Sequence, residues 1–101
     1  MAEINWTVEA ERWLRDIHDY IAATNPQAAT RVVEGMYDKV QLLRQFPELG
    51  YRYDRHPIQH IRILLYGHYR IAYLLKPDDN IDILGVFHGA LDLERYIPEQ
   101  P

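Results

Sequence analysis

Residues 68–88 read HYRIAYLLKPDDNIDILGVFH, and this segment carries the clearest β-hairpin pattern in the chain. Apolar residues alternate with other residues on both sides of the segment KPDDN, a pattern typical of two antiparallel strands joined by a turn. A five-residue loop sets the register, and residues opposite each other then share a face. One face is predicted to carry the pairs Leu75–Ile81, Tyr73–Ile83, Ile71–Gly85 and Tyr69–Phe87. The other face carries the pairs Leu74–Asp82, Ala72–Leu84, Arg70–Val86 and His68–His88.

A further strand precedes this hairpin, in the apolar run HIRILLY of residues 60–66. The turn signal between the two is YGH (66–68), and its length decides where Arg62 points. A three-residue loop puts Arg62 on the face that holds Arg70, whereas a two-residue loop turns it toward the core. We favour the three-residue loop because burying a guanidinium without a partner is costly.

Two amphipathic helices lie upstream of these strands. Thr7 is a suitable N-cap for the first, and Asn25 followed by Pro26 is a typical start for the second. Their apolar stripes are Ala10, Trp13, Leu14, Ile17, Tyr20 and Ile21, then Ala29, Val32, Val33, Met36, Val40 and Leu43. The short connection predicts an antiparallel helical hairpin, which the segment FPELG (46–50) ends. Gly35 inside the second helix indicates a close approach of the two helices.

The order of these elements defines the fold class. EINWT (3–7) predicts a short first strand, and YRYDRHPIQ (51–59) is expected to be irregular. The predicted fold is α+β, β-α-α-β-β-β, with the helical hairpin packed on one face of a small, mainly antiparallel sheet. A chain of 101 residues is expected to form a single domain, residues 1–101.

Composition narrows the classes of function. The chain has no Cys, no secretion signal at its N-terminus and no apolar run long enough to span a membrane, so we expect a soluble cytoplasmic protein. Its net charge of −4 argues against a surface that binds nucleic acid everywhere. Residues 51–75 nevertheless hold four basic residues and one acidic residue, which favours an anionic partner at one place or, equally, a solvated face.

Arg70, His68 and His88 are the candidate site residues, joined by Arg62 if the YGH loop has three residues. An Arg beside an imidazole is suited to a phosphate, because the guanidinium can bind a developing phosphorane while His exchanges a proton near neutral pH. The simpler interpretation, polar residues on an open sheet face with Asp82 as counter-ion, is favoured on pattern alone.

The remaining chemistry-bearing motifs are weak. His56 and His60 are separated by three residues, and one of these is Pro57, which does not suit a helical metal site. The sequence has neither a Gly-rich phosphate loop nor a nucleophile elbow. We therefore expect no metal and no cofactor.

Several short motifs, taken in order, resemble the RelE/ParE superfamily of bacterial toxins of type II toxin-antitoxin modules. AERWLRDIHDYIA and NPQAATRVV are similar to its first two helices, and FPELG is similar to its helix-ending P-x-x-G. HYRIAYLL resembles its Y-R-I-x-Y strand, and ILGVFHGALD its closing strand. The resemblance covers nearly the whole chain and implies a cognate antitoxin as partner.

The resemblance implies one of two activities. RelE-like members are ribosome-dependent mRNA endonucleases, in which Arg70 would match the Arg that stabilises the scissile phosphate and His88 a residue used in acid-base work. No general base can be assigned, and Asp54 is only a loop candidate. ParE-like members poison DNA gyrase; here Arg62, His68 and Arg70 would at most contact the target or a partner, and His88 would be structural.

We favour the ParE type. A toxin that enters the RNA-lined ribosomal A site should gain from broad positive charge, and this acidic chain lacks it. The segments NPQAATR and HGALD are also more similar to ParE than to RelE. A relative that binds a partner without being toxic is the third alternative.

Overall fold

The computed structural model describes residues 2–54 and 60–88 of the chain. The helices and strands in these ranges are β1 (Ile4–Trp6), α1 (Val8–Ala22), α2 (Pro26–Gln41), the 3-10 helix η1 (Leu42–Arg44), β2 (Tyr51–Arg52), β3 (Ile61–Tyr66), β4 (Tyr69–Leu75) and β5 (Ile81–His88). The strands form one sheet in the order β1-β5-β4-β3-β2. β1 runs parallel to β5, and the other neighbours are antiparallel. The predicted α+β class and element order are confirmed; β2 adds a short strand within the segment expected to be irregular.

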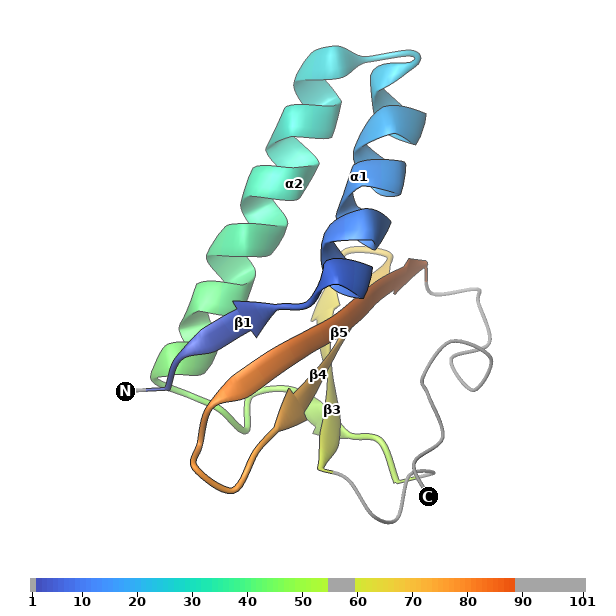
Figure 1. The fold of residues 1–101 in the computed structure, drawn as a ribbon. Coiled ribbons are helices and arrows are strands. Elements are labelled where there is room, and N and C mark those ends of the chain that lie inside the picture. The colour runs from blue at the N-terminus through green and yellow to red at the C-terminus, as the bar shows by residue number, and fades with distance from the viewer. Residues whose placement is uncertain (1, 55–59, 89–101) are drawn as a thin grey trace.

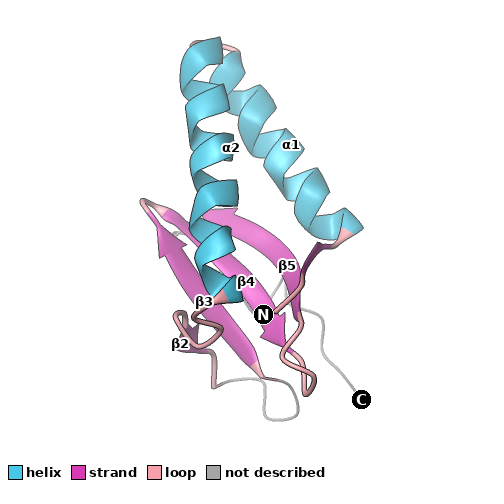
Figure 2. Cartoon of the chain, turned by 90° about the vertical axis from the view of Figure 1, so that its left-hand side faces the viewer, coloured by secondary structure: helices cyan, strands magenta, loops and turns pink. Residues whose placement is uncertain are grey.

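The helices form an antiparallel hairpin over one face of the sheet (Figure 2). The end of this hairpin that holds the α1–α2 connection extends well beyond the sheet (Figure 1). Both helices begin at the predicted caps: the Thr7 hydroxyl accepts a hydrogen bond from the Ala10 N–H (3.1 Å), and the Asn25 side chain accepts one from the Ala28 N–H (3.0 Å). The Thr7 hydroxyl also donates to the Ile83 carbonyl at 2.7 Å, which ties the start of α1 to β5.

Apolar packing divides into two clusters. The larger one lies between the helices and the sheet and contains Ala2, Ala10, Leu14, Met36, Val40, Leu43, Leu64, Ile71, Tyr73, Ile81, Ile83 and Val86. The smaller one is formed by Ile61, Ile63, Ala72 and Phe87. Along β4 the two clusters alternate, with Ile71 and Tyr73 in the larger one and Ala72 in the smaller one, as expected of a strand with an apolar face on each side.

Gly35 permits a close approach, but not the one predicted from the sequence. A Cβ at this position would collide with the hydroxyl of Tyr66 at the end of β3. The close neighbour of Gly35 is therefore a side chain of the sheet and not α1. The reason is geometrical: α2 lies over the sheet, and only a residue without a side chain leaves room for the large ring.

The β4–β5 register is as predicted at one end and shifted at the other. Tyr73 pairs with Ile83, Leu74 with Asp82 and Leu75 with Ile81. A bulge between Ala72 and Tyr73 then shifts the pairing by one residue, so that Ala72 pairs with Gly85, Ile71 with Val86, Arg70 with Phe87 and Tyr69 with His88. Five predicted pairs beyond the bulge are therefore wrong: Ala72–Leu84, Ile71–Gly85, Arg70–Val86, Tyr69–Phe87 and His68–His88. A bulge adds one residue to one strand, and residues beyond it change face.

The predicted three-residue loop between β3 and β4 is also wrong. Tyr66 pairs with Tyr69, so only Gly67 and His68 form the loop, and Gly67 adopts the positive φ of 58° that tight hairpins favour. Arg62 then pairs with Tyr73, and both side chains lie on the face of the sheet that the helices cover. The cost of this placement is offset because carbonyl groups receive the guanidinium, as described below.

Candidate functional site

The β3–β4 hairpin tip brings two of the predicted residues together. The rings of His68 and His88 are stacked, with centroids 6.3 Å apart and an interplanar angle of 24°. The Tyr69 ring meets the His88 ring edge to face at 5.8 Å. Both imidazoles are exposed, so the pair is accessible from solvent.

Arg70 lies on the opposite face of the β4–β5 pair from Tyr69 and His88. It pairs with Phe87 on β5 and with Leu65 on β3, whereas its neighbour Tyr69 pairs with His88. Successive residues of a strand point to opposite faces, so Arg70 and His88 are directed apart. Arg70 is half-buried, and within residues 2–54 and 60–88 its side chain forms no hydrogen bond or ion pair. The arrangement offers a guanidinium on one face and imidazoles on the other.

Arg62 is not part of this tip. Its Nη1 donates to the Gly50 carbonyl at 2.6 Å and to the Glu48 carbonyl at 3.2 Å. A guanidinium that donates to two main-chain carbonyls is held in one orientation. The Arg62 guanidinium therefore stabilises the loop after η1, and its contact with a target or partner stays a prediction.

The same loop, residues 47–50, is also hydrogen-bonded to Tyr73, whose ring lies in the larger apolar cluster. The Tyr73 hydroxyl donates to the Pro47 carbonyl (2.7 Å) and accepts from the Gly50 N–H (2.9 Å). Burial raises the pKa of Tyr73, against the lowering effects of the Gly50 hydrogen bond and of Arg62. We call residues 47–50 the anchored loop. The spacing in FPELG signalled a helix end, but gave no sign that Tyr73 and Arg62 hold it.

The sequence also offers Asp54 as a candidate general base and His56 and His60 as candidate metal ligands. The Asp54 carboxylate lies 3.6 Å from the Arg52 side chain in an exposed ion pair, which is not the setting of a general base aimed at a phosphate. His60 is exposed, and His56 lies outside the described residues. In the described part of the chain, no three His, Asp or Glu side chains lie close enough together to hold a metal ion.

Two surfaces suit a protein partner. A groove between the helices is lined by Glu11, Leu14, Arg15, His18, Val33 and Tyr37. The Tyr37 hydroxyl donates to the Glu11 carboxylate at 3.0 Å. The pKa of Tyr37 is raised, mainly by burial and to a smaller extent by this hydrogen bond. The second surface is the outer edge of β3, where β2 pairs only with Arg62 and Ile63 among the described residues.

That outer edge carries an exposed apolar residue. Leu65 is 53% exposed, and the three residues from 64 to 66 have no strand beside them on this edge within the described ranges. Unpaired N–H and C=O groups on a strand edge can pair with a strand of another chain. The edge therefore offers a site for a partner strand, next to a side chain that gains from burial.

The described residues form a small α+β domain, in which a helical hairpin covers one face of a mixed sheet whose first strand runs parallel to the last. A family model described as "ParE toxin of type II toxin-antitoxin system, parDE" matches residues 4–93. The chain belongs to this family. Neither helix in the described ranges combines the length and apolar character needed to cross a bilayer.

Solved structures share this fold. A chain of the chromosomal ParDE toxin-antitoxin system from P. aeruginosa is 23% identical, with a TM-score of 0.71, and the match covers 87% of this chain and 96% of that chain. A chain of the RelBE2 toxin-antitoxin complex from Mycobacterium tuberculosis is also 23% identical, with a TM-score of 0.58, covering 86% and 96%. Among curated proteins, none matches the chain.

Proposed function

We propose that the chain is the toxin of a type II pair, that it acts in the cytoplasm by inhibiting DNA gyrase, and that a cognate antitoxin neutralises it. Its membership of the ParE toxin family supports the first part. The solved relatives named above come from a ParDE system and a RelBE2 complex, which supports an antitoxin as partner.

The observation that favours gyrase over mRNA cleavage is the separation of Arg70 from His88. A ribonuclease site of the RelE type would need the guanidinium and the imidazole at one phosphate, because one stabilises charge while the other moves a proton. The bulge directs these side chains to opposite faces of the β4–β5 ladder. The acidic net charge of −4 also fits poorly with entry into an RNA-lined site.

Induction of the gene tests this proposal. Growth arrest with filamentation and a DNA damage response is expected, and the purified protein should inhibit gyrase supercoiling. Programmed ribosomes should carry intact mRNA. Absence of any growth arrest would favour the non-toxic relative instead.

Variants of Arg70 and His88 separate the two activities. If the protein cleaved mRNA, Arg70→Ala should lower the rate by about 10²- to 10³-fold, the usual loss for one preorganised donor to an oxyanion. His88→Ala should lower it by about 10²- to 10⁴-fold, as for a general acid or base. A-site cleavage by the wild type, lost in both variants at unchanged melting temperature, would overturn the gyrase proposal.

The antitoxin is expected to use the helical groove and the outer edge of β3. A disordered partner can add a strand to such an edge and lay a helix in such a groove, folding as it binds. Hydrogen exchange of the complex should show protection gained at residues 64–66 and at Val33 or Tyr37. Protection gained at neither surface would contradict this placement.

A further inference from the structure

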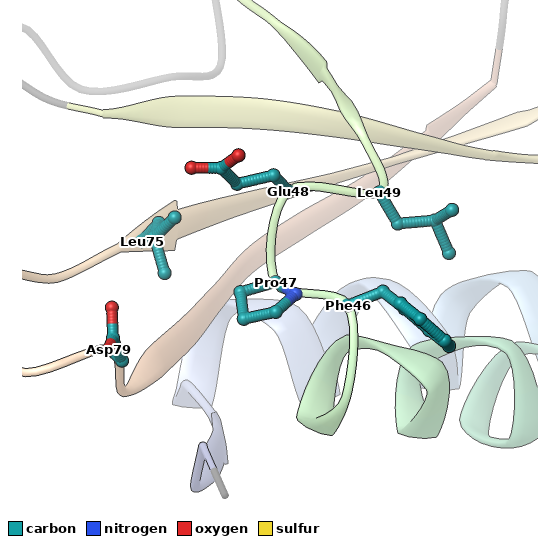
Figure 3. Close-up of a pocket in the computed structure, with 6 residues that line it drawn as sticks. All are labelled: Phe46, Pro47, Glu48, Leu49, Leu75 and Asp79. Carbon is teal, nitrogen blue, oxygen red and sulfur yellow. The ribbon is translucent and has the colours of Figure 1, made fainter.

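A pocket lies at the opposite end of β4 from Arg70, between the anchored loop and the turn that joins β4 to β5 (Figure 3). It has a volume of about 510 Å³. Its lining residues are Phe46, Pro47, Glu48, Leu49, Leu75 and Asp79. Neither the helical groove nor the β3 edge contributes to it.

Both walls of the pocket are held by hydrogen bonds. Tyr73 and Arg62 fix the anchored loop through the contacts described above. In the β4–β5 turn, the Lys76 N–H donates to the Asn80 carbonyl and the Asp79 N–H donates to the Lys76 carbonyl, each at 2.9 Å. A site with walls held by hydrogen bonds loses little conformational entropy when a partner binds.

The pocket has an apolar side and an acidic side. Figure 3 shows the side chains of Phe46 and Leu49 together, away from the two carboxylates, which lie on the side of Leu75. Phe46 is 57% exposed and Leu49 is 46% exposed. Contact with a partner would therefore remove apolar surface from water.

The two carboxylates have no cation of their own in the described part of the chain. Neither the Glu48 nor the Asp79 side chain forms a hydrogen bond or ion pair there. Lys76, the cation of the same turn, lies 3.3 Å from Asp82, and Arg62 is bound to main-chain carbonyls. A positive group from a partner would thus meet two carboxylates that have no ion-pair partner among residues 2–54 and 60–88.

We propose that this pocket binds two neighbouring residues of a partner peptide, a large apolar residue against Phe46 and Leu49 and a Lys or Arg directed to Glu48 and Asp79. Resting on the proposed function, the partner is the antitoxin. Apolar burial supplies the affinity, and charge complementarity sets the direction in which the peptide runs. An acidic peptide is repelled by the same carboxylates.

Two dipeptide probes test the pocket without the antitoxin. Acetyl-Leu-Arg-amide and acetyl-Leu-Glu-amide are titrated into the ¹⁵N-labelled full-length protein, followed by amide chemical shifts. The Arg probe should shift the signals of Leu49, Leu75 and Asp79 and bind at least about 5-fold more tightly than the Glu probe. The double variant Glu48→Gln/Asp79→Asn should weaken the Arg probe by about 3- to 10-fold, as expected for two exposed charge pairs.

Glu34→Gln is the matched control, because Glu34 is an exposed carboxylate on α2 outside the pocket lining, and it should leave both affinities unchanged. Equal binding of the two probes, or shifts confined to other residues, would overturn the proposal. An antitoxin bound equally well by wild type and the double variant would also overturn it, while leaving the proposed function intact. If induction shows no toxicity but the Arg probe binds as expected, the proposed toxin function is wrong, whereas the proposed peptide binding by the pocket is supported.

Discussion

The two ends of β4 use polar side chains in opposite ways. Near its C-terminal end, Tyr73 and the facing Arg62 donate their hydrogen bonds to carbonyls of the anchored loop. At its N-terminal end, the exposed His68 and His88 and the half-buried Arg70 surround a two-residue turn. The same residue types that suggest chemistry in a sequence thus serve the fold at one end and remain accessible at the other.

The role of an Arg or Tyr side chain in this fold depends on the groups that its polar atoms contact. At the anchored loop, removing one partner leaves a buried main-chain group without a hydrogen bond, which is costly. At the hairpin tip, water can replace a lost side chain. Substitutions should therefore reduce stability at the first place and affect only partner or target binding at the second.

The largest effect is expected for Gly50→Ala. A Cβ at Gly50 would lie 2.7 Å from the Ile63 carbonyl oxygen and 2.8 Å from the Tyr73 ring, so the loop must move. The free energy of unfolding should fall by about 2 to 3 kcal/mol, measured by urea denaturation. Gly67→Asn is the control. Apart from Gly67 and its two chain neighbours, no described atom lies within 4 Å of the Cβ position, and Asn tolerates the positive φ, so the change should stay below about 0.5 kcal/mol. Equal losses in the two variants would remove the contrast between the ends.

Tyr73→Phe should cost somewhat less. The ring still fills the core, but the Gly50 N–H and the Pro47 carbonyl lose their partner. A loss of about 2 kcal/mol is expected from one buried group left unpaired. Tyr69→Phe at the hairpin tip should change the stability by less than about 0.5 kcal/mol, and thermal unfolding of the two variants side by side measures the difference.

The two arginines offer a direct comparison. Arg62→Ala should lower the free energy of unfolding by about 1 kcal/mol, because two carbonyls lose a charged donor but can be partly hydrated. Arg70→Ala should leave it within about 0.5 kcal/mol of wild type, since Arg70 has no polar partner among the described residues. A larger loss for Arg70 than for Arg62 would show that the assignment of the two residues is reversed.

The smallest effect is a slope of stability against pH. The pKa values of Tyr73 and Tyr37 are raised in the folded state, mainly by burial, so the unfolded chain loses these protons first as the pH rises. Their contribution is complete below the unfolded value of 10.0 and is lost as the pH climbs above it. Denaturation midpoints between pH 8 and roughly 11 should fall at the alkaline end. The double variant Tyr37→Phe/Tyr73→Phe should flatten this fall; an unchanged slope would contradict the assignment.

Much of the fold follows from local sequence signals. Thr7 and Asn25 cap the helices as predicted because a cap is a contact between residues three apart, and its chemistry is present in the sequence itself. The alternation in β4 and β5 likewise predicted the pairing at Tyr73, Leu74 and Leu75, next to the turn that sets it. The helical hairpin and its place on one face of the sheet follow from the same apolar periodicity.

The bulge in the last hairpin could not be predicted. Leu84 and Val86 are both apolar, as are Ile83 and Phe87, so the segment suits burial on either face and its alternation does not reveal an inserted residue. The shift moves His88 from the expected face to the opposite one. The grouping of Arg70 with His88, on which the ribonuclease alternative depends, was therefore beyond what the pattern could decide.

The orientation of Arg62 is the clearest example of a feature that could not be inferred from the sequence. Its sequence neighbours are apolar, so a position facing the helices looked too costly without a partner. Its partners are the carbonyls of Glu48 and Gly50, more than ten residues away, whose approach depends on the end of α2, the Tyr73 hydroxyl and the pairing of β2 with β3. The helices, the strands and their order can be inferred from residue identity, since these elements depend on contacts between near neighbours. Which polar groups stabilise the fold and which are left for a partner depends on the packed chain, because every residue has a main-chain carbonyl and the sequence does not show which side chain donates to it.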